Sequence, residues 1–115
     1  MAIQVIRQSA QYDGLGEPGA VPVPLSEPAC QVRTRAIRIT GSEDRDTGIW
    51  ECSVGSFARQ VEKAEVMHIL AGSGVFTPEA GEAVRFSAGD TLFFPANTRG
   101  AWEIRETVRK VYVLL

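Results

Sequence analysis

The sequence predicts an all-β fold in a single domain, residues 1–115. Short segments rich in apolar and β-branched residues alternate with turn signals every 8–12 residues. No segment of ten or more residues has a clear 3.6-residue period, which argues against long amphipathic helices. A chain of 115 residues is long enough to bury one hydrophobic core. These observations favour a sandwich or a barrel, but periodicity alone does not choose between them.

The N-terminal third combines strands with one unusual segment. Residues 2–7 carry β-branched residues and predict a short strand. Residues 12–28, the Gly/Pro segment, contain four of the six prolines and three glycines, so we expect an extended arm or a surface loop. Residues 31–40 return to β character, and the charged residues at 41–48 predict a solvated loop.

The remainder of the chain predicts a regular series of strands. Residues 49–54 alternate, which places Trp50, Cys52 and Val54 on one face. Residues 65–72 are apolar on both faces, as expected for a strand buried on both sides. Tight turns are expected at 72–74, 78–83 and 87–90, with further strands at 75–78, 84–86, 91–95, 101–106 and 108–115.

Composition and charge exclude several functional classes. The net charge of −2 and the scattered arginines do not favour nucleic acid or an anionic membrane as a partner. No apolar run approaches the ~20 residues of a membrane span, and the N-terminus lacks the apolar core of a signal peptide, so we expect a cytoplasmic protein. In a reducing compartment, Cys30 and Cys52 are expected to be free thiols.

Two motifs and their flanking residues narrow the fold. A glutamate in "EVMHILAG" precedes a turn glycine by seven residues, and "GDTLFFP" follows about one hairpin later. The flanking pattern includes a Trp-x-Cys-x-x-Gly-x-Phe stretch and a late Trp-Glu pair. The matching positions are Trp50, Cys52, Gly55, Phe57, Glu65, Ile69, Leu70, Gly72, Gly89, Asp90, Pro95, Trp102 and Glu103.

In this order and spacing, the pattern resembles the cupin superfamily. It is most similar to small single-domain cupins related to the cupin domain of ureidoglycine aminohydrolase, over about residues 48–115. The resemblance implies a double-stranded β-helix (jelly-roll) barrel, with N-terminal strands and an arm in 1–45 and the barrel motifs in 46–115. It also implies a homodimer, in which the N-terminal arm can cross to the second copy.

The usual cupin metal ligands are mostly missing. In metal-binding cupins the first motif supplies two histidines and a glutamate, and the second motif supplies a third histidine. Glu65 occupies the glutamate position, and Gly100 occupies the position of the third histidine. The first two histidine positions fall on Arg59 and Val61, or on Ala58 and Gln60 one residue earlier. We therefore expect no metal cofactor, and Glu65 as a ligand if a metal is present.

Without a metal, an arginine can stabilise the buried glutamate. Arg59 precedes Glu65 by six residues, and this even separation places both side chains on one face of a regular strand. A guanidinium beside the carboxylate lowers the cost of burying it. The alternative spacing points Arg59 to solvent at a hairpin tip. We predict a ligand site in the barrel interior formed by Glu65, Arg59, Trp50, Met67 and Trp102, with the two tryptophans acting as core residues or pocket walls.

Two further side chains remain open as secondary site residues. His68 is three positions from Glu65, so it points to the opposite face and is expected to pack against the second sheet or a partner subunit. It acts as a general base only if a bulge turns it inward. Cys52 is expected to be a buried, inert thiol, because no histidine or other cation is evident beside it.

Three functions are compatible with this sequence. The first is a metal-independent cupin that binds a small metabolite in the barrel as a sensor or accessory subunit. The second is an enzyme of small-metabolite metabolism, acting on ureide-like or sugar-derived compounds as the resemblance implies. The third is a structural or interaction module, which a filled barrel interior would favour. The sequence assigns neither a ligand nor a catalytic residue.

Overall fold

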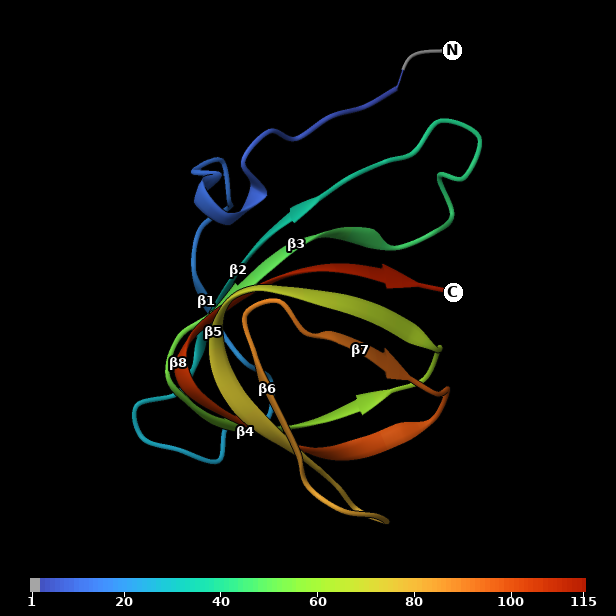
Figure 1. The fold of residues 1–115 in the computed structure, drawn as a ribbon. Coiled ribbons are helices and arrows are strands. Elements are labelled where there is room, and N and C mark those ends of the chain that lie inside the picture. Colours follow the sequence, from blue (N-terminus) through green and yellow to red (C-terminus); the bar gives the residue numbers. More distant parts are fainter. Residues whose placement is uncertain (1–2) are drawn as a thin grey trace.

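The computed structural model describes residues 3–115, and strands form almost all of its regular structure (Figure 1). Eight strands join one hydrogen-bonded network, and a single 3-10 turn is the other regular element of these residues. The elements are η1 (Ser9–Gln11), β1 (Gly19–Ala20), β2 (Gln31–Ala36), β3 (Thr47–Cys52), β4 (Gly55–Val61), β5 (Glu65–Pro78), β6 (Val84–Ser87), β7 (Thr91–Phe94) and β8 (Thr98–Leu114). No helix among them is long and apolar enough to cross a membrane.

Two long strands, β5 and β8, organise the fold. β8 pairs antiparallel with β3, β4 and β5, and β5 pairs in addition with β6 and β7. Neighbouring strands therefore curve around a common interior, as Figure 1 shows. Because β5 carries register shifts between Ile69 and Gly74, it bends enough to serve both halves of the barrel.

The interior is dominated by aromatic side chains. Trp102 lies at its centre, with its ring 5.0 Å from Phe76, 5.4 Å from Phe86 and 5.6 Å from Phe94, measured between centroids. Phe57 stacks on Trp102 from β4 at 6.3 Å. Such pairs add specific geometry to a large buried apolar area, so they fix how the strands face each other.

The Gly/Pro segment closes the gap between β2 and β4. On one side, Gly16 N–H donates to Thr34 O and Val21 N–H donates to Cys30 O, while β1 pairs with β2. On the other side, Ala58 N–H donates to Val23 O and Leu25 N–H donates to Ser56 O. The segment is irregular over most of its length, as its prolines and glycines predict. In this chain it lies along its own barrel.

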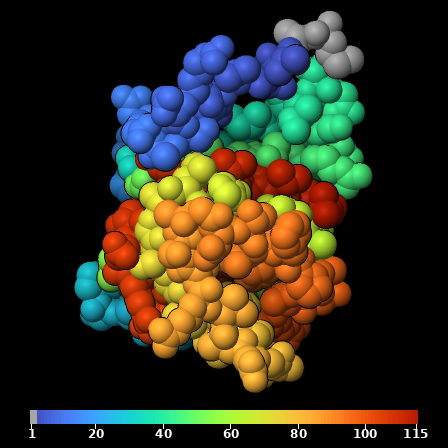
Figure 2. All heavy atoms as spheres, viewed as in Figure 1, coloured from blue at the N-terminus to red at the C-terminus, as the bar shows by residue number. Residues whose placement is uncertain are grey.

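The N-terminal residues cover one end of the molecule (Figure 2). Arg109 of β8 ties them down: Nη1 donates to Ser9 O at 3.0 Å and to Tyr12 O at 2.6 Å. Its Nε and Nη2 atoms bind Glu51 at 3.0 and 2.7 Å. Burial opposes ionisation of Glu51, but hydrogen bonds from Arg33 and Arg109 outweigh it and lower the pKa of this carboxyl below its usual value.

Several expectations about individual elements were wrong. Residues 3–6 of the predicted strand 2–7 form no strand, and Ala2 lies outside the described residues. Residues 72–74 form no turn, because β5 continues through them to Pro78. The segments 101–106 and 108–115 are not two strands, because residues 98–114 form the single strand β8. Val54 is 55% exposed rather than beside Trp50 and Cys52, since β3 ends at Cys52.

Other turn predictions were confirmed. The hairpin at 79–83 joins β5 to β6, and the turn before Asp90 joins β6 to β7. Asp90 caps this turn, since its Oδ2 atom accepts a hydrogen bond from the Ser87 N–H at 2.9 Å. The charged residues 41–46 form an exposed loop between β2 and β3.

Candidate functional site

A polar pocket of about 230 Å³ opens into one end of the barrel interior. Seven residues line it, and they come from β3, β4, β5, β8 and the loop before β3: Asp46, Trp50, Arg59, Glu65, Lys110, Tyr112 and Leu114. The strand register explains this convergence, because Lys110 pairs with Trp50 on one side and Tyr112 with Met67 on the other. Inward-facing positions of three strands thus meet at one place.

Glu65 is the centre of the pocket. Its side chain is fully excluded from solvent, and each carboxylate oxygen accepts a hydrogen bond from a cation. Arg59 Nη2 lies 3.1 Å from Oε1, and Lys110 Nζ lies 3.0 Å from Oε2. A buried carboxylate without such partners would be strongly destabilised, so these two contacts allow Glu65 to stay ionised in the interior.

The predicted pairing of Arg59 with Glu65 was confirmed. Both side chains line one pocket, although they lie on different strands, β4 and β5, each of which pairs with β8. The Arg59 side chain is 30% exposed rather than free in solvent. In the part of the chain that the structure describes, Arg59 makes this one side-chain hydrogen bond, so its remaining N–H donors are available to a ligand.

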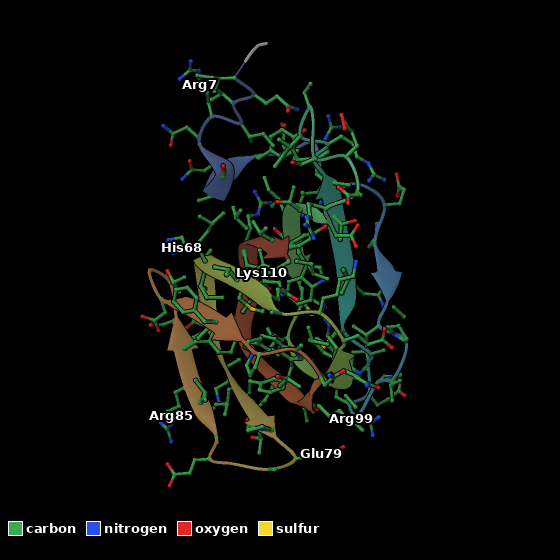
Figure 3. The ribbon with its side chains drawn as sticks, turned by 90° about the vertical axis from the view of Figure 1, so that its right-hand side faces the viewer. Arg7, His68, Glu79, Arg85, Arg99 and Lys110 are labelled. Carbon is green, nitrogen blue, oxygen red and sulfur yellow. The ribbon has the colours of Figure 1, made fainter. Side chains whose placement is uncertain are left out.

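Lys110 lies among the strands of the barrel (Figure 3), and aromatic rings as well as Glu65 surround its amino group. Its Nζ atom lies 4.5 Å from the ring centroid of Trp50 and 5.3 Å from that of Trp102. It also lies 3.5 Å from Met67 Sδ. Burial lowers the pKa of Lys110 to about 8, although the charge of Glu65 acts in the opposite direction. Lys110 is therefore the most perturbed cation of the described chain.

Tyr112 supplies the remaining polar group deep in the pocket. Burial raises the pKa of its hydroxyl, and the negative charges of Asp46 and Glu65 act in the same direction. Tyr112 therefore remains protonated at neutral pH and can donate a hydrogen bond.

The other predicted site residues lie around the pocket rather than in it. Met67 and Trp102 are fully buried behind Lys110, and neither lines the pocket. Trp102 belongs to the core, and its Nε1 donor has no partner within residues 3–115. His68 is exposed on the opposite face, where its Nδ1 atom lies 2.8 Å from Thr91 Oγ1.

Cys52 lies deeper in the core, next to Cys30. Both thiols are free and buried. Burial raises the pKa of Cys52, and the neighbouring Cys30 adds to this shift. Since the thiolate is the reactive form, this environment suits an inert thiol, as the sequence predicted.

Sequence reasoning missed Lys110 and Tyr112. The signal was present, because Val108, Lys110 and Tyr112 alternate with outward residues in the same strand as Trp102. Trp102, Val108, Lys110 and Tyr112 are separated by even numbers of residues, so in one continuous strand they would all be expected on the interior face. Treating this region as two separate strands removed that link.

The residues present do not fit the metal site that the cupin resemblance implies. Both oxygens of Glu65 are engaged by cations, and Arg59 occupies a ligand position. At Gly100, an added Cβ would lie 2.4 Å from Thr77 O, so no histidine side chain is accommodated there without movement of the backbone. Within residues 3–115, no three His, Cys, Asp or Glu side chains are grouped to hold a metal ion.

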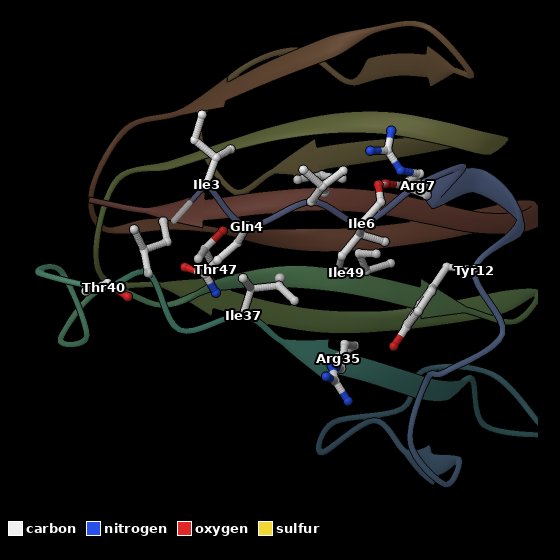
Figure 4. A pocket seen from close by; sticks show the side chains of 15 residues that line it. Ile3, Gln4, Ile6, Arg7, Tyr12, Arg35, Ile37, Thr40, Thr47 and Ile49 are labelled. Atoms are coloured by element: carbon white, nitrogen blue, oxygen red, sulfur yellow. Dashed lines mark hydrogen bonds between the residues drawn. The ribbon is translucent and has the colours of Figure 1, made fainter. Parts of the chain in front are cut away.

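A larger hollow lies elsewhere (Figure 4). It has a volume of about 880 Å³ and lies between the N-terminal residues 3–12 and the outer faces of β2 and β3. Its lining is mostly apolar and includes Ile6, Ile37 and Ile49, with few titratable groups. It resembles an uncovered packing surface rather than a site for chemistry.

Comparison with known proteins shows the family of this fold. A family model described as "EutQ-like cupin domain" matches residues 40–112. The EutQ protein of Clostridium difficile has a similar structure, with a TM-score of 0.66 and 21% identity over 82% of this chain and 79% of that chain.

Two further solved structures are similar. A protein of the DUF861 family from Thermotoga maritima has a TM-score of 0.58 and 30% identity, over 71% of this chain and 99% of that chain. A protein of unknown function from Pseudomonas syringae has a TM-score of 0.71 and 24% identity, over 88% of this chain and 43% of that chain. No curated protein matches the sequence.

Proposed function

The chain belongs to the family of EutQ-like cupin domains, and we propose that it binds a small organic anion in the barrel without a metal ion. The observation that carries this proposal is the placement of two cations, Arg59 and Lys110, around the single buried carboxylate of Glu65. Around the buried carboxylate, two positive charges and one negative charge leave a positive excess, because Asp46, the other acidic residue of the lining, is exposed to water that screens its charge. An anion entering this low-dielectric site is attracted more strongly than it would be in bulk water.

Arg59 is the residue best suited to contact the ligand. One of its terminal nitrogens donates to Glu65, which restricts the orientation of the guanidinium, and its other donors make no further side-chain hydrogen bond within residues 3–115. A guanidinium in a fixed orientation can bind a carboxylate through two parallel hydrogen bonds. Lys110 is almost fully buried, so it is less accessible to a ligand. Its roles are to stabilise Glu65 and to add a positive charge to the interior wall of the pocket.

The remaining walls define the size and polarity of the ligand. Trp50 gives a flat apolar wall, and Tyr112 gives a hydroxyl group. At ~30 Å³ for each water molecule, the pocket has room for roughly seven waters. This volume suits a small metabolite with one or two polar groups, and such a combination of apolar walls with few polar groups is typical of ligand sites.

A titration with acetate and its neutral analogue acetamide tests this proposal. We expect acetate to shift the NMR signals of Trp50 and Arg59, and acetamide to bind at least about tenfold more weakly. Arg59→Gln should weaken acetate binding about tenfold, whereas Arg85→Gln, an exposed arginine on β6, should leave it unchanged. Equal binding of acetate and acetamide, or an unaltered affinity in Arg59→Gln, would refute anion binding at this site.

Elemental analysis tests the absence of a metal from the proposed mechanism. We expect the purified protein to contain far less than one equivalent of transition metal, and chelation to leave acetate affinity unchanged. Stoichiometric metal that is lost in Glu65→Ala would instead assign Glu65 as a metal ligand.

An enzyme acting on ureide- or sugar-related compounds is the second candidate. The observation in its favour is the buried Lys110 beside Glu65, because a lysine whose pKa is lowered to about 8 can exchange a proton near neutral pH. Turnover of such a compound that disappears in Lys110→Met, while the variant remains folded, would support this function. If the protein binds such compounds but turns none of them over, the first candidate, a binding protein, is favoured. A pure interaction module would bind none of these compounds.

We also propose that the protein is a homodimer. The hollow of Figure 4 is bordered by exposed apolar residues, with Ile3 91%, Val5 58% and Ile39 44% exposed. A second copy, including its N-terminal arm, would remove this surface from water. Sedimentation should give twice the monomer mass for the wild type and the monomer mass for Val5→Asp. Val54→Asp, at an equally exposed valine outside the hollow, is the matched control.

A cytoplasmic location completes the proposal, with no nucleic acid or membrane partner. Its support is the charge of the chain, because a net charge of −2 and scattered arginines do not favour nucleic acid or an anionic membrane.

A further inference from the structure

A second hollow of about 580 Å³ lies beneath the Gly/Pro segment. This hollow, the side compartment, is bounded by the Gly/Pro segment on one side and by β2, β3 and β4 on the other. Its walls are largely apolar and include Val21, Val23, Val32 and Phe57. Three exposed polar residues, Glu17, Thr34 and Gln60, also belong to its lining.

The side compartment adjoins the polar pocket. Trp50 and Arg59 line both hollows, so the two spaces meet at these side chains. One space holds Glu65, Lys110 and Tyr112, whereas the other holds valines and a phenylalanine. Together the two spaces form a site with a charged part and an apolar part, and Arg59 and Trp50 line both parts.

From this arrangement we infer that the ligand is an amphiphilic carboxylate, whose head binds Arg59 and whose apolar body lies in the side compartment. The inference rests on the proposed function and specifies the class of ligand. The free donors of Arg59 are the only unpaired cationic groups that both hollows share in residues 3–115. Trp50 also lines both hollows, so its ring offers the apolar body a flat surface beside Arg59.

The Gly/Pro segment determines the shape of the side compartment. Val21 is almost fully buried and anchors the segment in the core, whereas Val23 is 53% exposed and stands over the opening. Hydrogen bonds to β2 and β4 hold the segment at both sides, but Pro22 and Pro24 between them donate none. The position of Val23 relative to Trp50 therefore limits how long or wide the apolar body can be.

A homologous series of carboxylates tests the inference. Acetate, butanoate and hexanoate share one head and differ only in the number of methylene groups. Each buried methylene should multiply the affinity by about fourfold, so hexanoate should bind at least about tenfold more tightly than acetate. Hexan-1-ol, which has the chain without the charge, should bind at least about tenfold more weakly than hexanoate.

Two variants locate the gain in affinity in the side compartment. Thr34→Trp, at an exposed lining position of β2, should fill the compartment and bring hexanoate down to the affinity of acetate. Val23→Asn should reduce hexanoate affinity severalfold. Val54→Asn is the matched control, since Val54 is 55% exposed and lines neither hollow. Acetate affinity should be unchanged in all three variants.

The outcomes separate this inference from the proposed function. If acetate binds through Arg59 but affinity does not rise with the chain length of the carboxylate, anion binding stands and the amphiphilic ligand is refuted. If chain length increases affinity equally in wild type and Thr34→Trp, the apolar body lies elsewhere and the inference is refuted. If no carboxylate binds, both fail together. Hexan-1-ol binding as tightly as hexanoate would also overturn the inference, because the head would contribute nothing.

Discussion

The Nζ atom of Lys110 lies 3.0 Å from Oε2 of Glu65, and both side chains are almost completely excluded from solvent. These residues are on neighbouring strands, yet 45 positions apart in the sequence. Removing two charges from water is costly, so such a pair contributes little net stability compared with apolar residues of similar size. Its presence in the barrel therefore favours a role in the site over a role in the core.

Lys110→Met should destabilise the protein because it leaves Glu65 with Arg59 alone. We expect a loss of about 3 kcal/mol in the free energy of unfolding, measured by urea denaturation at pH 7. The double variant Glu65→Gln/Lys110→Met should recover most of this loss, because no unpaired charge remains. Lys63→Met, at an exposed position in the loop before β5, should change stability by less than about 0.5 kcal/mol. A double variant no more stable than Lys110→Met would show that Lys110 acts through packing.

Stability should depend on pH through Lys110. Burial lowers its pKa from 10.5 to about 8 in the folded protein, so the unfolded chain binds more protons between these values. The contribution of Lys110 to stability therefore rises with pH in this window, by up to ~3 kcal/mol at ~1.4 kcal/mol for each pKa unit.

The difference in unfolding free energy between wild type and Lys110→Met isolates this effect. Tyr112 and Cys52 have raised pKa values, so they make stability fall as their unfolded forms ionise, but they do so in both proteins. We expect the difference to increase from pH 7.5 to pH 9.5. A constant difference would show that Lys110 has an ordinary pKa.

Asn97 adopts a left-handed backbone with φ of 62°, as we predicted from the turn that follows Pro95. Asparagine tolerates this conformation better than other side chains, whereas a β-branched residue does not. Asn97→Val should lower stability by about 1 kcal/mol or more through backbone strain. Asn97→Gly should be neutral or slightly stabilising in the same thermal melts. Equal melting temperatures for the two variants would exclude strain as the cause.

Gly100 should not accept a side chain. It pairs with Arg59 on β4, and an added Cβ would lie 2.4 Å from Thr77 O and 2.6 Å from the Phe76 ring. Gly100→Ala should therefore cost about 1–3 kcal/mol through overpacking. Gly100→His should be destabilised further and should not gain metal affinity by calorimetry with Zn²⁺. A stable Gly100→His variant that binds zinc would show that the ligand position is still usable.

The strand content and the cupin resemblance could be predicted from sequence because each depends on local pattern. The Arg59–Glu65 pair was predicted from parity along one strand, but the two residues lie on separate strands, β4 and β5, so their contact depends on both strands facing a common interior. Lys110 could not be recognised without knowing that β8 is continuous from Thr98 to Leu114. Gly72 was misinterpreted for a related reason. Its φ of +88° suits a turn, but the close approach of Thr107 O from β8, at 2.1 Å from an added Cβ, is a long-range contact.

The N-terminal elements show a second limit of local patterns. Residues 3–6 have the β-branched composition of a strand but find no neighbouring strand with which to pair. The Gly/Pro segment has the opposite character. Its composition argues against a strand, yet it makes backbone hydrogen bonds to two strands, because an unfilled gap in the barrel is available to it.

That gap has a consequence for biosynthesis. The Gly/Pro segment is translated before either of the edges that it joins, and its contacts with Ser56 and Ala58 cannot form until β4 has left the ribosome. β4 in turn requires β8, the last strand of the chain, as its neighbour. The β4 side of this first-made part must therefore remain unpaired until the last-made part of the barrel is in place. A nascent chain held before this stage exposes the edge of β4 and the unpaired side of the Gly/Pro segment, which are then open to pairing with another polypeptide.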